Sequence, residues 1–125
     1  MRGVLVLAHG SKRRETEDTL NAVVSMLREE LREAGEAAEV EGGFLQFSER
    51  DLHAGLNALA DKGADEILVA PYFLFAGNHI KEDIPAEIEE FAKARPGVRV
   101  RLGGTLGADR RLARILRDRV LEAAE

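Results

Sequence analysis

The sequence of 125 residues contains no cysteine and no tryptophan, and only one tyrosine and three prolines. Without cysteine the chain has neither disulfides nor thiolate ligands, so any metal chemistry has to use histidine, carboxylate, amide or water ligands. No apolar run approaches the roughly 18 residues of a membrane span. The first apolar run is followed by basic residues, where a signal peptide would need a cleavage site. We therefore expect a cytoplasmic protein that binds no membrane.

Positive charge is also in short supply, with 18 basic residues against 23 acidic ones and a formal net charge of −5. This balance argues against a nucleic-acid partner, because phosphate binding needs a basic face, although a local basic patch could hold a small anion. The composition is otherwise ordinary for a globular protein, 45% hydrophobic and 33% charged, without repeats or tracts. We expect a single domain over residues 1–125.

Apolar spacing alternates between short runs of branched residues and longer stretches with helical period, which is typical of a βαβα chain. Strands are expected at residues 3–8, 38–45, 66–71 and 98–102, with a helix after each. Pro85 fits only the first turn of the third helix, so residues 77–83 are expected to form a loop or a separate kinked turn. Asp109 is placed to cap the fourth helix, which is expected to bury a face made of Leu112, Ile115, Leu116 and Val120.

Charge patterning predicts the order of the strands. Residues 3–8 and 66–71 are nearly continuous apolar runs, as in central strands covered on both faces, whereas charges alternate into residues 38–45 and 98–102. With right-handed crossovers this gives an α/β fold with a four-stranded parallel sheet in the order 2-1-3-4, flanked by helices in a flavodoxin-like arrangement. Ligands of such sheets bind at the carboxyl ends of the strands where the winding reverses, here the first and third strands.

One histidine follows each of these two central strands, His9 after the first and His79 after the third. Two neutral imidazoles that face one crevice can hold a divalent metal or share proton transfer near neutral pH. The remaining histidine, His53, falls in the exposed first turn of the second helix and is interpreted as a solvated surface residue.

The segments beside the two histidines suggest the kind of ligand. Gly10 and Ser11 expose backbone N–H groups at a helix start, and Lys12, Arg13 and Arg14 follow, which favours an anionic ligand. In the segment 71–75, Phe73, Leu74 and Phe75 are too apolar for a surface loop and suit a flat organic ligand. Phe44, Leu45 and Phe47 are candidates to line the crevice from the side of the second strand. Burial of these segments in the core or against a second subunit remains an alternative.

Three stretches, "VLVLAHGS", "FLQF" and "APYFLFAGNHIKEDIP", together with the four βα units, resemble the small sirohydrochlorin cobaltochelatases of the CbiX type over nearly the whole chain. The resemblance implies half of a chelatase fold and an enzyme, a lyase, that inserts a divalent metal into the polycarboxylate tetrapyrrole sirohydrochlorin without ATP or an organic cofactor. The metal is then the substrate, Co²⁺ for cobalamin biosynthesis in the first place, with Fe²⁺ for sirohaem or Ni²⁺ as alternatives. A homodimer is also implied.

The resemblance further implies roles for particular residues. His9 and His79 would hold the metal and accept the pyrrole protons. The remaining candidates would bind the macrocycle and its carboxylates: Gly10, Ser11, Lys12, Arg13, Leu45, Gln46, Phe47, Pro71, Leu74, Phe75, Gly77, Asn78 and Lys81.

Gln46 departs from the family pattern, which often has a glutamate at this position. A neutral amide can offer an oxygen to a metal but cannot act as a carboxylate base. Either the two histidines suffice, or Glu49 or Glu82 substitutes.

Two other classes of function stay open at this point. Phosphoryl transfer through a histidine after the first strand would need an arginine just before His9, where this sequence has Ala8. A non-catalytic tetrapyrrole or metal carrier remains an alternative because of Gln46.

Overall fold

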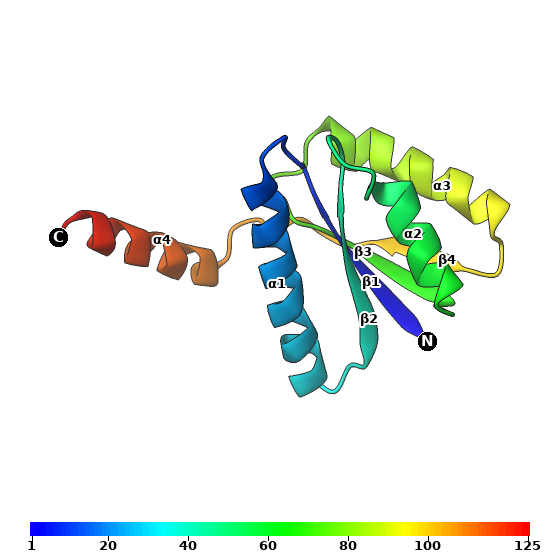
Figure 1. The fold of residues 1–125 in the computed structure, drawn as a ribbon, viewed down its shortest axis with the longest axis horizontal. Coiled ribbons are helices and arrows are strands. Elements are labelled where there is room, and N and C mark those ends of the chain that lie inside the picture. Colours follow the sequence, from blue (N-terminus) through cyan, green and yellow to red (C-terminus); the bar gives the residue numbers. More distant parts are fainter.

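The computed structural model describes residues 1–78 and 81–125 with their side chains. Four strands, β1 (Arg2–Ala8), β2 (Ala38–Phe44), β3 (Glu66–Pro71) and β4 (Arg99–Leu102), form one sheet in the order β2-β1-β3-β4 (Figure 1). All three neighbouring pairs are parallel. The predicted α/β class and strand order are confirmed, with the charged strands β2 and β4 at the edges.

Each strand is followed by helix: α1 (Arg14–Glu33) after β1, α2 (Leu52–Asp61) after β2, the π-helical turn η1 (His79–Asp83) and α3 (Ile84–Ala94) after β3, and α4 (Arg110–Ala123) after β4. Pro85 occupies the first turn of α3, as predicted, and the kinked turn expected before it is η1. The Asp51 and Asp109 carboxylates cap α2 and α4 by accepting hydrogen bonds from Ala54 N (2.8 Å) and Arg111 N (2.9 Å). Among the described residues, no helix is long and apolar enough to cross a membrane.

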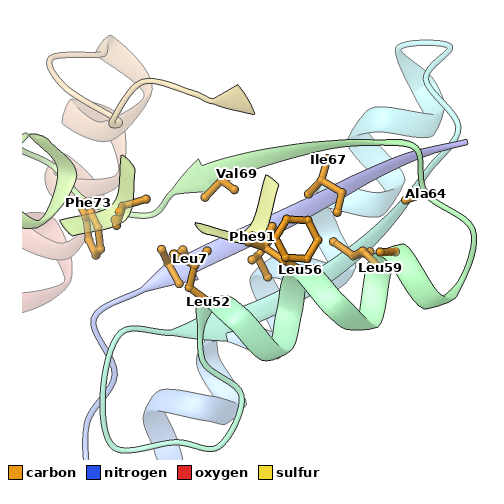
Figure 2. Packing of buried hydrophobic residues seen from close by; sticks show 12 residues of the cluster. Leu7, Leu52, Leu56, Leu59, Ala64, Ile67, Val69, Phe73 and Phe91 are labelled. Carbon is orange, nitrogen blue, oxygen red and sulfur yellow. The ribbon is translucent and has the colours of Figure 1, made fainter. Parts of the chain in front are cut away.

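Two hydrophobic clusters hold the layers together, one on each face of the sheet. On one face, Leu20 and Val24 of α1 pack against Val4, Val6 and Val40 of β1 and β2. The opposite face is covered by α2 and α3, and Figure 2 shows how their side chains meet those of β1 and β3. The members of this larger cluster that the figure labels are Leu7, Leu52, Leu56, Leu59, Ala64, Ile67, Val69, Phe73 and Phe91.

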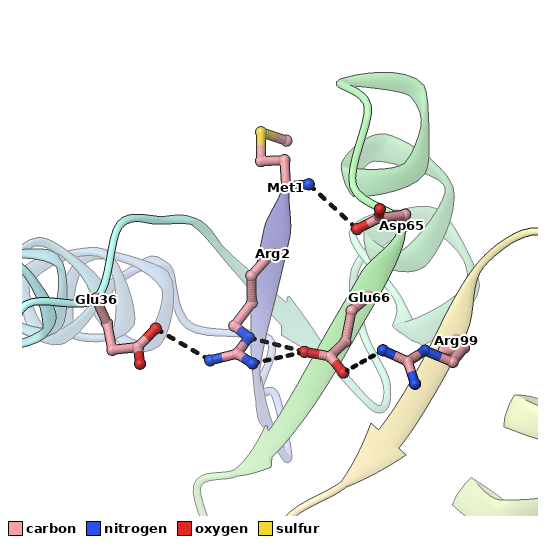
Figure 3. A network of polar contacts seen from close by, with 6 residues as sticks. All are labelled: Met1, Arg2, Glu36, Asp65, Glu66 and Arg99. Carbon is pink, nitrogen blue, oxygen red and sulfur yellow. Dashed lines mark hydrogen bonds and ion pairs between the residues drawn. The ribbon is translucent and has the colours of Figure 1, made fainter.

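Ion pairs connect three strands at the end of the sheet where the strands begin (Figure 3). The Glu66 carboxylate accepts from Arg2 (2.8 Å) and Arg99 (3.1 Å), so three strands are joined through one side chain that is only 13% exposed. Arg2 also reaches Glu36 at 3.0 Å. The hydrogen bond from Arg2, with the charges of Arg2 and Arg99, holds the pKa of Glu66 below its ordinary value. This network lies at the amino-terminal end of the strands, opposite to the carboxyl end where His9 follows β1.

The last helix, α4, does not follow the sequence prediction. Leu112, Ile115, Leu116 and Val120 were expected to form its inner face, yet α4 buries none of its residues. Figure 1 shows α4 extending away from the sheet and from the other helices. The apolar periodicity of α4 is therefore real, but within this chain only Leu112 of that face is half-buried and the other three residues are exposed.

Candidate functional site

His9 lies directly after the last residue of β1, at the carboxyl edge of the sheet. Its ring packs against the ring of the buried Phe73, with 4.3 Å between ring centroids and an interplanar angle of 43°. Phe73 belongs to the segment that follows β3. The carboxyl ends of the two central strands thus place the His9 imidazole and the Phe73 ring side by side. The exposed His9 side chain thus packs against a residue of the core.

The backbone around His9 is fixed by the loop that follows β2. Leu45 N donates to Ala8 O (2.9 Å) and Gln46 N donates to His9 O (3.2 Å), so the pairing of β1 with β2 continues past both strands. Gly10 then turns away with a φ of +89°, and a Cβ at this position would overlap the Gln46 carbonyl oxygen. Only glycine allows this close approach, which accounts for Gly10 beside the histidine.

A cavity of about 440 Å³ opens beside His9. It lies between the loops after β1 and β2 and the first turns of α2 and α3, on the α2–α3 face of the sheet. Its lining combines donors of several kinds with apolar side chains. The lining residues are His9, Leu45, Gln46, Asp51, Leu52, His53, Asp83, Ile84, Ala86 and Glu87.

Four polar residues of this cavity were missed by the sequence analysis. His53 is exposed, as predicted, but it also lines the cavity and meets Phe91 edge to face at 6.4 Å. Asp51, Asp83 and Glu87 supply the carboxylates, whereas Glu49 and Glu82, the two predicted substitutes for the family glutamate, are exposed and are not among the lining residues. The sequence spacing of Asp83 and Glu87 could have predicted that the two carboxylates lie together, because residues four apart at the start of a helix share one face.

Of the predicted anion-binding residues, Ser11, Lys12, Arg13 and Arg14 line a second, smaller cavity of about 220 Å³ at the start of α1. Ser11 Oγ accepts from Arg13 N (2.9 Å), which shapes this turn. Lys12 Nζ lies 5.4 Å from the centroid of the Phe47 ring. Phe47 adopts a φ of 60°, unusual for an aromatic residue, and it is 56% exposed. Ser11, Lys12, Arg13 and Phe47 thus form a basic and aromatic rim of their own.

The other predicted site residues are spread over the segment after β3. Pro71 is buried at the end of β3, while Leu74 and Phe75 are 50% and 81% exposed. Gly77, Asn78 and Lys81 are exposed as well. His79, the second predicted metal ligand, lies outside the residues whose side chains are described.

The geometry gives the larger cavity both metal-binding and proton-accepting groups. Imidazole nitrogens, carboxylate oxygens and an amide oxygen all suit first-row divalent ions. Among the described residues, no three histidine or acidic side chains come together closely enough to hold a metal ion. In the described part of the cavity, the possible metal-binding side chains are thus spread along the wall, with apolar side chains between them.

The sequence matches the model of the CbiX family over residues 3–123. It is 36% identical to a sirohydrochlorin cobaltochelatase of Sulfurisphaera tokodaii, and the match covers 98% of this chain and 93% of that protein. It is 30% identical to the chloroplastic sirohydrochlorin ferrochelatase of Arabidopsis thaliana, with 94% of this chain and 51% of that protein covered. The chain therefore spans nearly the full length of the first relative and about half of the second.

Solved structures agree with this assignment. The sirohydrochlorin chelatase SirB of Bacillus subtilis, in complex with cobalt, superposes with a TM-score of 0.83 at 27% identity, over 97% of this chain and 50% of SirB. A CbiX protein of Marinobacter aquaeolei superposes with a TM-score of 0.70 at 31% identity, over 99% of this chain and 98% of that protein. The resemblance drawn from the sequence motifs is thus confirmed, and the protein belongs to the CbiX family.

Proposed function

We propose that the protein is a sirohydrochlorin cobaltochelatase, which inserts Co²⁺ into sirohydrochlorin without an organic cofactor. The observation that carries this proposal is the position of His9, fixed by Phe73 at the edge of a cavity with imidazole, carboxylate and apolar lining. The cobaltochelatase names of relatives that match it along nearly their full length support cobalt as the metal.

In the proposed mechanism, the neutral imidazole of His9 binds the hydrated metal beside one face of the macrocycle. His79 is proposed as the second ligand. As the four ring nitrogens replace water on the divalent metal, the two that carry a proton give it up, and the histidines are proposed to accept these two protons. Asp83 and Glu87 face the same cavity and are proposed to balance the charge of the metal in place of the glutamate that Gln46 replaces.

The macrocycle itself needs an apolar surface and cations for its carboxylates. We assign the apolar contact to Leu45, Phe47, Leu74 and Phe75, of which Phe47 and Phe75 are strongly exposed. We assign the carboxylate contacts to Ser11, Lys12, Arg13 and Lys81. The first three surround the smaller cavity at the start of α1, where the helix dipole also favours an anion.

Insertion of iron for sirohaem is the second candidate function. It is supported by ferrochelatase relatives at 30% and 31% identity and by the structure of SirB of Bacillus subtilis with Fe³⁺. These ferrochelatases, unlike the cobaltochelatase of Sulfurisphaera tokodaii, are about twice as long as this chain, so we rank cobalt first.

We also propose that the protein works as a homodimer in the cytoplasm. The chain covers about half of SirB, so two copies would supply as much structure as one SirB chain. A second copy would enclose a site that a single four-stranded domain leaves open.

The test is the visible absorption spectrum of sirohydrochlorin mixed anaerobically with Co²⁺, with and without the protein. We expect the protein to accelerate insertion and His9→Ala to abolish the acceleration, with His79→Ala doing the same. Lys93→Ala, on the exposed end of α3, is the control and should keep the wild-type rate. Parallel runs with Fe²⁺ and Ni²⁺ rank the metals. Tight tetrapyrrole binding without acceleration would identify a carrier instead and overturn the proposal.

A further inference from the structure

His53 lines the cavity of about 440 Å³ together with His9, but the proposed mechanism gives it no role of its own. It lies in the first turn of α2, whereas His9 follows β1, so the two imidazoles reach the cavity from different elements. His53 is also exposed to solvent. Its side chain therefore borders both the cavity and the surrounding water.

Contacts within α2 and with α3 hold His53 in this position. Its ring meets the ring of the buried Phe91 edge to face, with 6.4 Å between centroids and an interplanar angle of 83°. Figure 2 shows Phe91 inside the hydrophobic cluster on this face of the sheet. The Asp51 carboxylate caps the same helical turn, and Asn57 Nδ2 donates to His53 O (3.1 Å). A core side chain and a capped helix thus fix the imidazole at the cavity wall.

Metal insertion releases a proton at a stage when the metal-binding imidazoles cannot take it. A neutral imidazole has one basic nitrogen, and a metal binds through the lone pair of that same nitrogen. While His9 or His79 holds the metal, its ring therefore cannot accept a proton. In the proposed mechanism the metal is still on the protein when the first pyrrole nitrogen binds it. The first pyrrole proton then needs another base.

The described part of the cavity contains two kinds of base besides His9. One is the imidazole of His53, and the other is the set of carboxylates of Asp51, Asp83 and Glu87. Carboxylates, with ordinary pKa values of about 4, are weak bases at neutral pH, whereas imidazoles gain and lose a proton near neutrality. Asp51 is also engaged in the helix cap. The chemistry of proton transfer thus favours His53 over its acidic neighbours.

We propose that His53 accepts the first pyrrole proton and passes it to the solvent. The pyrrole N–H bond breaks, and its electron pair stays on the nitrogen, which becomes a ligand of the metal. The proton goes to the neutral imidazole of His53, directly or through one water molecule. The imidazolium then gives this proton to water or buffer on its exposed side, which restores the neutral ring. This inference rests on the proposed function and deepens it.

Chemical rescue of His53→Gln tests this role, because glutamine keeps a polar side chain but is no base. In weak buffer at neutral pH, we expect the rate of Co²⁺ insertion to fall by roughly 100-fold, as for loss of a positioned base. Added 2,6-lutidine, a hindered base that takes a proton but binds metals poorly, should restore most of the rate. Sodium chloride at the same ionic strength should restore none. An unchanged rate, or a slow rate that lutidine does not restore, would overturn the proposal.

Binding measurements separate proton transfer from a structural role. The affinities of His53→Gln for Co²⁺ and for sirohydrochlorin, each measured alone, should equal those of the wild type, whereas a distorted cavity would weaken them and contradict the proposal. Ala58→Gln is the matched control, since it places the same amide at an exposed position of the same helix that is not among the lining residues. It should keep the wild-type rate.

The same rates distinguish failure of this inference from failure of the proposed function. If the wild type did not accelerate Co²⁺ insertion, both would fail. If the wild type accelerated insertion and His53→Gln did so equally well, only the role of His53 would fail.

Discussion

At the scale of single residues, Gln46 occupies the position where a carboxylate would serve best. It lines the cavity with His9, and its backbone N–H is bonded to the His9 carbonyl. We expect Gln46→Glu to tighten Co²⁺ binding by roughly tenfold, since an added carboxylate beside a metal ligand typically changes affinity by about this factor. Competition with a coloured chelator measures the affinity. Unchanged affinity would mean that Asp83 and Glu87 already supply all the negative charge that the metal needs.

The left-handed backbone conformation of Gly10 leads to a second prediction for a single residue. Gly10→Ala forces a side chain into a left-handed backbone conformation and against the Gln46 carbonyl oxygen. We expect a loss of about 1–3 kcal/mol in the free energy of unfolding, together with a displaced His9. Urea unfolding gives the first and the metal-insertion rate gives the second. A fully stable and fully active variant would contradict the role given to this turn.

At the scale of elements, the placement of α2 depends on Gly55. A Cβ at this position would lie 2.6 Å from Leu5 Cδ1, so α2 rests almost directly on β1. Alanine is the better helix former, yet we expect Gly55→Ala to destabilise the protein by about 1–3 kcal/mol through overpacking. Because His53 and Asp51 sit at the start of the same helix, the variant should also lower the rate of metal insertion. Thermal unfolding and the insertion assay measure the two effects.

The control for this substitution is Gly97→Ala, where a Cβ would meet nothing within 4 Å. Its stability should stay within about 0.5 kcal/mol of the wild type. If Gly97→Ala lost as much stability as Gly55→Ala, the close approach of α2 to β1 would not be the cause.

At the scale of the whole molecule, the ion pairs around Glu66 make the free energy of unfolding depend on pH. The pKa of Glu66 is lowered from its ordinary value of 4.5 in the folded protein, chiefly by the hydrogen bond from Arg2. A group with a depressed folded pKa stabilises the fold above its unfolded pKa, and this contribution disappears as the pH falls through the folded pKa. The wild type should therefore have a larger free energy of unfolding than Glu66→Gln at neutral pH. This difference should shrink as the pH falls below 4.5, the ordinary pKa of the glutamate. Urea unfolding across this pH range measures it, and a gap that is independent of pH would contradict the assignment.

The sequence analysis predicted the architecture well for a physical reason. Strand order followed from which strands carry charge, such as Glu39 and Arg101, because a strand in the middle of a two-sided sheet has no solvated face for them. The exposure of α4 could not be predicted, since apolar periodicity shows that a helix has an apolar face but not whether the rest of the chain covers it. Asp83, Glu87 and His53 were missed for a related reason. Their approach to His9 depends on how the starts of α2 and α3 converge in space.

The exposed position of α4 has a consequence for how the native state is reached in time. A helix of 14 residues with no buried side chain gains little from its own hydrogen bonds, because isolated helices of about this length are marginal in water. The sheet with α1, α2 and α3 can assemble within one chain, as a first-order event. Ordering of the last helix gains no fully buried contact from that assembly, so α4 should unfold and reform while the rest of the protein stays folded. Its backbone amides should therefore exchange their hydrogens with solvent much faster than those of the sheet.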